Sequence, residues 1–281
     1  MKRPLGRIYT YNNLTQRILV GLAGASILIP SIIISEWSYF AVFLVIYILT
    51  QLEFYKVAGL DGFLPLKTWG TLSGAVTFTL TFLIQGHTLD DIWYFLLLPF
   101  FYGNFFIKLY KKDSIKPFTS IALTILGLIY VAIPFSLINF SAYTYGPYRY
   151  SIVLGILMIL WASDVGAYFA GVRFGKRKLF ERVSPKKTWE GFLGGMFLAC
   201  LMAYSFSRFF DVLNFWKWIV LAIIIVITGT YGDLIESMFK RSMKIKDSAS
   251  SIPGHGGFLD RFDALLIASP FITAFLRLTL F

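Results

Sequence analysis

The amino-acid sequence predicts an all-α, polytopic integral membrane protein that forms a single membrane domain over residues 1–281. Two observations carry this prediction. Hydrophobic residues make up 57% of the chain and charged residues only 15%, whereas a soluble domain usually carries about 25% charged residues. The apolar residues also gather in runs close to the ~20 residues that a helix needs to cross a membrane.

Nine apolar runs are expected to cross the membrane as helices. In chain order they cover approximately residues 16–35, 37–55, 66–85, 91–109, 117–138, 150–171, 189–207, 214–232 and 264–281. Pro99, Pro134 and Pro270 lie within three of these runs. Neighbouring helices can satisfy the carbonyls that prolines leave free, so these residues do not argue against the spans.

The Lys and Arg residues fall almost entirely on one side of these spans. With the N-terminus in the cytoplasm, only Arg149, Arg208, Lys217 and Arg277 of the 26 lie on the outer side. This asymmetry follows the positive-inside rule and places the C-terminus outside. The net charge of +11 therefore gathers on the cytoplasmic face, where it suits anionic lipid headgroups and nucleotide phosphates. Because the sequence contains no soluble domain of the kind that recognises nucleic acid, nucleic acid is not expected as a partner.

The polar loop between the last two spans is the most informative segment. If the preceding span continues as a helix, its spacing places five polar residues on one face: Asp233, Glu236, Ser237, Lys240 and Arg241. Asp260 and Asp263 lie three residues apart at the start of the last span, again on one face. Because Asp233 and Asp260 lie at the inner ends of the two connected helices, we expect their carboxylates to converge.

These residue types indicate metal-assisted transfer of a phosphorus group. Carboxylates are ligands that Mg²⁺ prefers, and the ion usually takes one or two of them together with substrate phosphates. Gly254, Gly256 and Gly257 permit a tight turn whose N–H groups can approach an anion before a helix N-terminus. The alternative is a salt-bridged loop at the membrane surface, but carboxylates in a membrane are costly and rarely without function.

Other polar residues have two interpretations each. Asp164 lies inside a span. It is either a site residue or the partner of a Lys or Arg at a helix end. Ser184 and Pro185 are typical of the start of a helix, which would present Lys186 and Lys187 near a helix N-terminus. Those lysines either bind phosphate or belong to a solvated basic loop.

Three further residues are candidates for capping, phosphate contacts or metal binding. Glu190 is either a capping carboxylate or a site residue. His255 either donates to a phosphate or shapes the glycine turn. The other histidine, His87, falls on the opposite side, so neither a histidine-based zinc site nor a Ser-His-Asp triad is expected.

Residues 237–263 match a longer pattern at every fixed position. The pattern reads Ser-x-x-Lys-Arg-x4-Lys-Asp-x5-Pro-x-His-Gly-Gly-x-x-Asp-Arg-x-Asp. It resembles the signature of the phosphatidate cytidylyltransferases, also called CDP-diacylglycerol synthases. The segments 164–171 and 184–191 are also similar to that family, so the likeness covers mainly residues 160–265. Ala264 is a departure, because family members often carry serine there.

The resemblance implies that the chain converts CTP and phosphatidate into CDP-diacylglycerol and pyrophosphate. It implies Mg²⁺ bound by Asp233 and Asp260, and leaves open a second cation such as K⁺. The implied catalytic residues are Asp233, Asp260, Asp263, Lys240 and Arg241. The implied substrate-binding residues are Asp164, Lys186, Lys187, Ser237, Lys246, Asp247, His255, Gly256, Gly257 and Arg261.

The resemblance also implies a homodimer in the cell's inner membrane, with the active site on the cytoplasmic face. The spans from 16 to 138 would form a scaffold and dimer part, and residues 150–281 the catalytic part. Two alternatives stay open. A CTP-dependent lipid kinase would transfer the terminal phosphate and release CDP, and a secondary transporter would use Asp164, Asp233 and Asp260 in an ion pathway.

Overall fold

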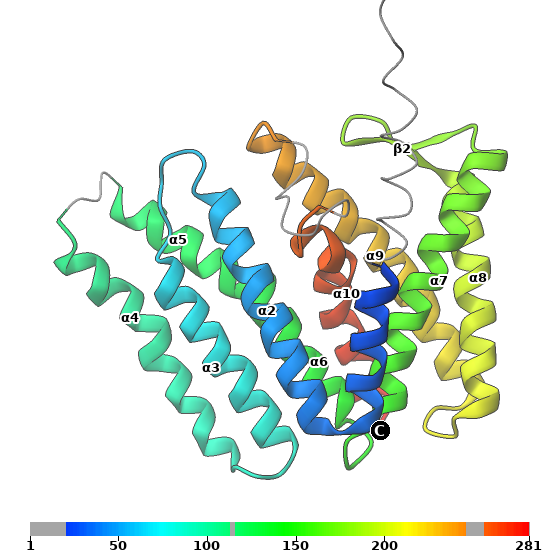
Figure 1. The fold of residues 1–281 in the computed structure, drawn as a ribbon, viewed down its shortest axis with the longest axis horizontal. Coiled ribbons are helices and arrows are strands. Elements are labelled where there is room, and N and C mark those ends of the chain that lie inside the picture. The colour runs from blue at the N-terminus through cyan, green and yellow to red at the C-terminus, as the bar shows by residue number, and fades with distance from the viewer. Residues whose placement is uncertain (1–20, 113–115, 246–255, 281) are drawn as a thin grey trace, which may run out of the picture.

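The regular structure of the protein is almost entirely helical, as predicted. The computed structural model describes residues 21–112, 116–245 and 256–280. Its helices run side by side between two ends of an elongated bundle (Figure 1). Six helical segments are long and apolar enough to cross a membrane: Glu36–Ala58, Asp91–Tyr110, Pro117–Ala142, Tyr150–Phe174, Trp189–Phe209 and Phe215–Ser242.

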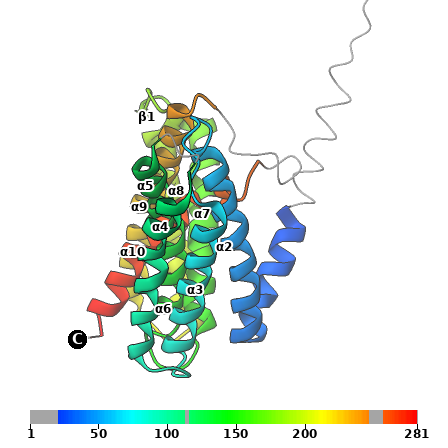
Figure 2. The same ribbon diagram turned by 90° about the vertical axis from the view of Figure 1, so that its left-hand side faces the viewer.

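A helix at Gly21–Ile34 precedes the numbered elements and lies at one edge of the bundle beside α2 (Figure 2). The elements of the first half are then α2 (Glu36–Ala58), α3 (Lys67–Gln85), η1 (Asp91–Leu96), α4 (Leu97–Tyr110), α5 (Pro117–Gly127), η2 (Leu128–Ala132) and α6 (Ile133–Ala142). Those of the second half are α7 (Tyr150–Phe174), β1 (Lys178–Phe180), β2 (Ser184–Thr188), α8 (Trp189–Phe209), α9 (Phe215–Ser242) and α10 (Leu259–Leu278).

The structure supports six of the nine predicted spans by length and apolar composition. The apolar helix Gly21–Ile34 is too short by this criterion, and the residues before it lie outside the described part of the chain. Helix α3 is rich in threonine, which lowers its mean hydropathy. Helix α10 carries Asp260, Arg261, Asp263 and Arg277 along its 20 residues, so every 18-residue stretch of it contains at least three charged residues, whereas each of the six spans has a stretch with two or fewer. The count of nine therefore stays a prediction.

Small residues bring the helices of the second half into close contact. A Cβ on Gly166 of α7 would lie 2.5 Å from the carbonyl oxygen of Gly194 in α8, so the two backbones pack directly against each other. A Cβ on Gly232 of α9 would lie 2.6 Å from the carbonyl oxygen of Asp263 in α10. Such small-residue contacts are typical of helix packing in membranes. The second contact brings Asp233 next to the first two turns of α10.

Buried hydrogen bonds join the helices of the first half. The Asn139 side-chain amide of α6 donates to the Phe78 carbonyl at 3.0 Å and to Thr81 Oγ1 at 2.9 Å, both in α3. The Tyr39 hydroxyl of α2 donates to Asn139 Oδ1 at 2.8 Å. Because lipid offers no hydrogen-bond partners, polar groups at this depth must satisfy one another within the protein. Asn139 therefore fixes three helices to one another.

The predicted helix start at Ser184 is wrong. Ser184 begins strand β2, which pairs antiparallel with β1 in a two-stranded hairpin. The backbone of residues 184–188 is extended because it pairs with β1, and the true N-cap of α8 is Thr188, whose hydroxyl accepts the Gly191 N–H at 3.2 Å. Lys186 and Lys187 consequently lie on a strand, with Lys186 exposed and Lys187 half-buried.

The basic residues separate between the two ends of the bundle. The hairpin, the α2–α3 connection and the end of α9 lie at one end, and the end of α10 lies at the other (Figure 1). Lys217, at the start of α9, donates to the Thr279 carbonyl at 2.8 Å, which places it at the same end as the C-terminal turn of α10. For the basic residues of the described ranges, the charge separation expected from the sequence is thus present along the bundle.

Candidate functional site

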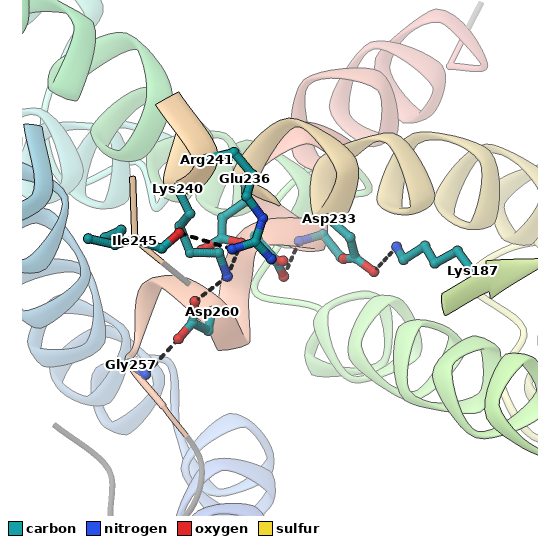
Figure 3. A network of polar contacts seen from close by, with 10 residues as sticks. Lys187, Asp233, Glu236, Lys240, Arg241, Ile245, Gly257 and Asp260 are labelled. Atoms are coloured by element: carbon teal, nitrogen blue, oxygen red, sulfur yellow. Dashed lines mark hydrogen bonds and ion pairs between the residues drawn. The ribbon is translucent and has the colours of Figure 1, made fainter. Parts of the chain in front are cut away.

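Helices α9 and α10 meet in a buried ion cluster. Lys240 Nζ lies 2.6 Å from Glu236 Oε2 and 2.8 Å from Asp260 Oδ1 (Figure 3). Glu236 is 1% exposed, and Lys240 and Asp260 are 12% and 13% exposed. The predicted continuation of the helix through residues 233–241 is confirmed, because α9 extends to Ser242. Helical spacing places Lys240 one turn beyond Glu236 and directly opposite the first turn of α10.

A glycine turn holds the Asp260 carboxylate from its other side. The Gly257 N–H donates to Asp260 Oδ2 at 2.9 Å. Gly256 has φ +82°, a conformation that L side chains rarely adopt, and a Cβ there would lie 2.6 Å from Asp260 Oδ2. A backbone N–H of this turn therefore approaches an anion, as expected, and that anion is the side chain of Asp260.

The β-hairpin supplies the partner of Asp233. Lys187 of β2 forms an ion pair with Asp233 Oδ2 (Figure 3). Glu190, in the first turn of α8, fixes the start of the hairpin, because its carboxylate accepts the N–H groups of Lys176 at 3.0 Å and Arg177 at 3.2 Å. Glu190 thus acts as a cap for the hairpin backbone.

The two predicted metal ligands contact different lysines in this structure. Asp233 faces the hairpin, whereas Asp260 faces Lys240 (Figure 3). Asp233 interacts electrostatically with Asp164 of α7 and with Asp263 of α10. Five carboxyl groups from three helices therefore gather around Lys187 and Lys240.

A cavity of about 250 Å³ opens beside Asp233. The charged residues that line it include Asp164, Lys187 and Asp233, and the apolar ones include Leu160 and Val226. Gly171, Gly191 and Gly195 also line it, at the close contact between α7 and α8. The lining of the cavity therefore combines charged and apolar side chains.

The donor set fits a magnesium ion that takes few protein ligands. Within the described ranges, no group of three or more His, Cys, Asp or Glu residues is arranged to hold a metal by itself. Among the residues that the structure describes, however, the buried Glu236 Oε1 has no hydrogen-bond partner. Mg²⁺ usually takes one or two carboxylates and completes its shell with phosphates and water. These residues suit such an ion once substrate phosphates are present.

The remaining predicted site residues are scattered around this cluster. Ser237 is half-buried on the same helix face, and Arg261 is exposed and interacts electrostatically with Asp164. Arg241 is exposed and donates to the Ile245 carbonyl at 3.0 Å, so its guanidinium binds its own chain after α9. Three predicted residues lie outside the described part of the chain: Lys246, Asp247 and His255.

Sequence reasoning left two polar residues out of the predicted site. Glu236 shares the predicted face and lies one helical turn from Lys240, a spacing that could have identified it as Lys240's partner. Tyr130 lies in the π-helical segment η2, and its buried hydroxyl interacts electrostatically with Asp263, Glu236 and Asp233. Segments of π-helix are frequent at functional sites, but an apolar run shows no sign of one in its sequence.

The chain is similar to known enzymes over about half of its length. It is 45% identical over 139 residues to a phosphatidate cytidylyltransferase of Haemophilus influenzae, which covers 47% of this chain and 48% of the relative. Proteins of the same name from Staphylococcus aureus and Staphylococcus haemolyticus are 41% and 42% identical over 125 residues, covering 44% of this chain and 48% of each relative. The aligned part of the chain spans about half the length of the curated relatives it matches.

A family profile covers nearly the whole sequence. The profile of the Cytidylyltransferase family matches residues 15–279, which includes the helices of both halves as well as the signature between Ser237 and Asp263. The resemblance drawn from that signature is thereby confirmed at the level of the family. The chain belongs to the cytidylyltransferase family.

Proposed function

We propose that this protein is a phosphatidate cytidylyltransferase, which forms CDP-diacylglycerol and pyrophosphate from CTP and phosphatidate. One observation carries the proposal. The cavity between α7, α8 and α9 is lined by Asp164, Lys187 and Asp233 together with apolar residues such as Leu160 and Val226, next to the ion cluster of the family signature. A lipid phosphate would contact the charged residues, and its acyl chains the apolar ones. The names of the relatives support the same substrate.

The proposed reaction needs charge neutralisation more than proton transfer. A phosphate oxygen of phosphatidate attacks the α-phosphorus of CTP, a new P–O bond forms, and the bond to the β-phosphate breaks as pyrophosphate leaves. Because the nucleophile is already an anion, no general base is required. Lys187 and Lys240, which pair with carboxylates in this structure, exchange those partners for substrate phosphates. Catalysis then rests on positioning and on stabilising the developing charge.

Magnesium is part of the proposal. Asp233 and Asp260 would hold the ion, and when bound it would neutralise phosphate oxygens and polarise the reacting phosphorus. Asp263 lies close enough to Asp233 to interact with it electrostatically. The requirement for a second cation such as K⁺ is tested by replacing K⁺ with Na⁺ in the assay and comparing the rates. Homodimer formation through the scaffold part is tested by the mass of the purified protein in detergent.

The products distinguish this function from its nearest alternative. Purified protein incubated with CTP, Mg²⁺ and phosphatidate is expected to yield CDP-diacylglycerol and pyrophosphate in equal amounts. A CTP-dependent lipid kinase would yield CDP and a lipid with an extra phosphate instead, and a transporter would yield neither pair. Chromatography of both the lipid and the nucleotide products decides between them. ATP is expected to replace CTP poorly, and equal rates with the two nucleotides would argue against recognition of the cytosine base.

We further propose that the hairpin end of the bundle faces the cytoplasm and that the protein lies in the inner membrane with its C-terminus outside. The separation of basic residues between the two ends supports this orientation. In a Cys200→Ser background, Glu181→Cys on the hairpin turn is expected to react with a membrane-impermeant thiol reagent only after the membrane is opened. Pro147→Cys, at the other end, is expected to react in intact cells. The reverse pattern would contradict both the orientation and the cytoplasmic site.

A further inference from the structure

The C-terminal end of α2 contacts the first turn of α10, more than two hundred residues later in the chain. Glu53 is 5% exposed, and its Oε2 accepts the Phe258 N–H at 2.8 Å. Phe258 is the residue immediately before α10, and it follows the glycine turn that holds Asp260. A carboxylate of the scaffold half therefore binds the backbone of the turn that carries a predicted catalytic residue.

The next residue of α2 contacts the other half of the ion cluster. The Phe54 ring stacks on Phe239 of α9, with centroids 5.2 Å apart and planes 17° from parallel. Phe239 directly precedes Lys240, the partner of Asp260. Two consecutive residues of α2 thus fix the two elements whose side chains form the Lys240–Asp260 ion pair.

The chemistry of Glu53 suits this position. The first N–H groups of a helix have no acceptor within the helix, and they carry partial positive charge from the aligned peptide dipoles. A carboxylate satisfies such an N–H with a charge-assisted hydrogen bond, which is stronger than a neutral one. Phe258 is the N-cap residue of α10, and its N–H finds its acceptor outside that helix, on Glu53 of α2.

We propose that Glu53 is a positioning residue of the active site: it holds the turn at residues 256–260 so that Asp260 faces Lys240 and the substrate phosphates. This inference rests on the proposed function. Glu53 acts through the backbone and Asp260 and does not itself touch the reacting atoms. The first half of the chain therefore determines site geometry, in addition to its role as a scaffold.

Three variants test the inference. Glu53→Leu removes the acceptor, Glu53→Gln keeps an oxygen that can accept the Phe258 N–H, and Thr124→Val is the matched control. Thr124 Oγ1 accepts the Leu66 N–H at 2.8 Å, so its loss removes a buried acceptor of a backbone N–H in the same half of the protein, away from α10. Each variant is compared with the wild type by hydrogen–deuterium exchange of the peptide covering residues 256–262 and by the Mg²⁺ dependence of turnover.

Glu53→Leu is expected to speed exchange at residues 256–262 by about tenfold or more, because losing one hydrogen bond makes local opening easier. Its kcat is expected to fall about 10- to 100-fold, the effect of a small displacement of a catalytic group, with a raised Mg²⁺ requirement. Glu53→Gln is expected to stay within about threefold of the wild type, since an uncharged acceptor remains. Thr124→Val is expected to change melting temperature but neither of these readouts.

The inference would be overturned if residues 256–262 exchanged hydrogen for deuterium at the same rate in Glu53→Leu as in the wild type. It would also be overturned if Glu53→Leu and Thr124→Val lost equal amounts of activity. The exchange measurement needs no turnover. If the wild-type protein forms no CDP-diacylglycerol, the proposed function fails, while the exchange comparison still decides whether Glu53 holds the turn.

Discussion

Asp260→Asn is expected to abolish turnover and leave the protein folded. The substitution replaces a carboxylate by an amide, a much weaker Mg²⁺ ligand, and it removes the charge that pairs with Lys240 at 2.8 Å. Cation binding is lost together with one of the two ion pairs of Lys240, so we expect turnover at saturating CTP to fall by at least about a hundredfold. Asn has nearly the same shape as Asp, and its side-chain oxygen can still accept the Gly257 N–H.

Stability separates this catalytic effect from a structural one. Lys240 keeps its ion pair with Glu236 when Asp260 is neutralised, so the variant does not leave an unpaired buried ammonium. Asp211→Asn, an exposed aspartate at the opposite end of the bundle, is the matched control. If Asp260→Asn keeps more than about a tenth of its activity, equivalent to under roughly 1.4 kcal/mol of barrier, Asp260 is not a principal metal ligand.

Asp233→Asn is expected to produce a loss of similar size for a different local reason. Asp233 is 29% exposed and forms the ion pair with Lys187 at the mouth of the cavity. It is also electrostatically linked to Asp164 and Asp263. An amide at this position weakens cation binding at the centre of the carboxylate cluster. We expect a loss of at least about a hundredfold that extra Mg²⁺ rescues only weakly.

The contribution of the hairpin is measured by comparison with Lys187→Met. If Asp233 only anchored the hairpin, removing either partner of the ion pair would lower activity equally. Our account predicts a larger loss for Asp233→Asn, because Lys187→Met removes one phosphate contact and leaves the carboxylate available to the cation. Monodisperse elution in detergent and an unchanged melting temperature confirm that each variant is folded. Equal losses in the two variants would assign Asp233 a structural role.

Much of the fold followed from local patterns in the sequence. Runs of apolar residues predicted the helices, and the periodic spacing of Asp233, Glu236 and Lys240 predicted one polar face of α9, which the ion pair between Glu236 and Lys240 confirms. The signature from Ser237 to Asp263 predicted the family. These features depend on residues close to one another in the chain, so a sequence contains them directly.

The contacts that sequence reasoning missed are formed between distant segments. Lys187 reaches Asp233 because the extended residues 184–188 pair with β1, whereas Ser184 and Pro185 alone favoured a helix start. Glu53 binds the Phe258 N–H across 205 positions of the sequence. Neither contact leaves a periodic pattern, because each depends on how whole helices pack.

The path of the phosphorus atoms of CTP tests the central claim most directly. The wild-type protein and Asp260→Asn are reconstituted into vesicles that contain phosphatidate and are supplied with Mg²⁺ and CTP labelled at either the α- or the γ-phosphorus. The account predicts that the wild type transfers the α-label to lipid and releases the γ-label as pyrophosphate, and that Asp260→Asn does neither. Transfer of the γ-label to lipid, or transfer of the α-label by Asp260→Asn at more than about a tenth of the wild-type rate, would contradict it.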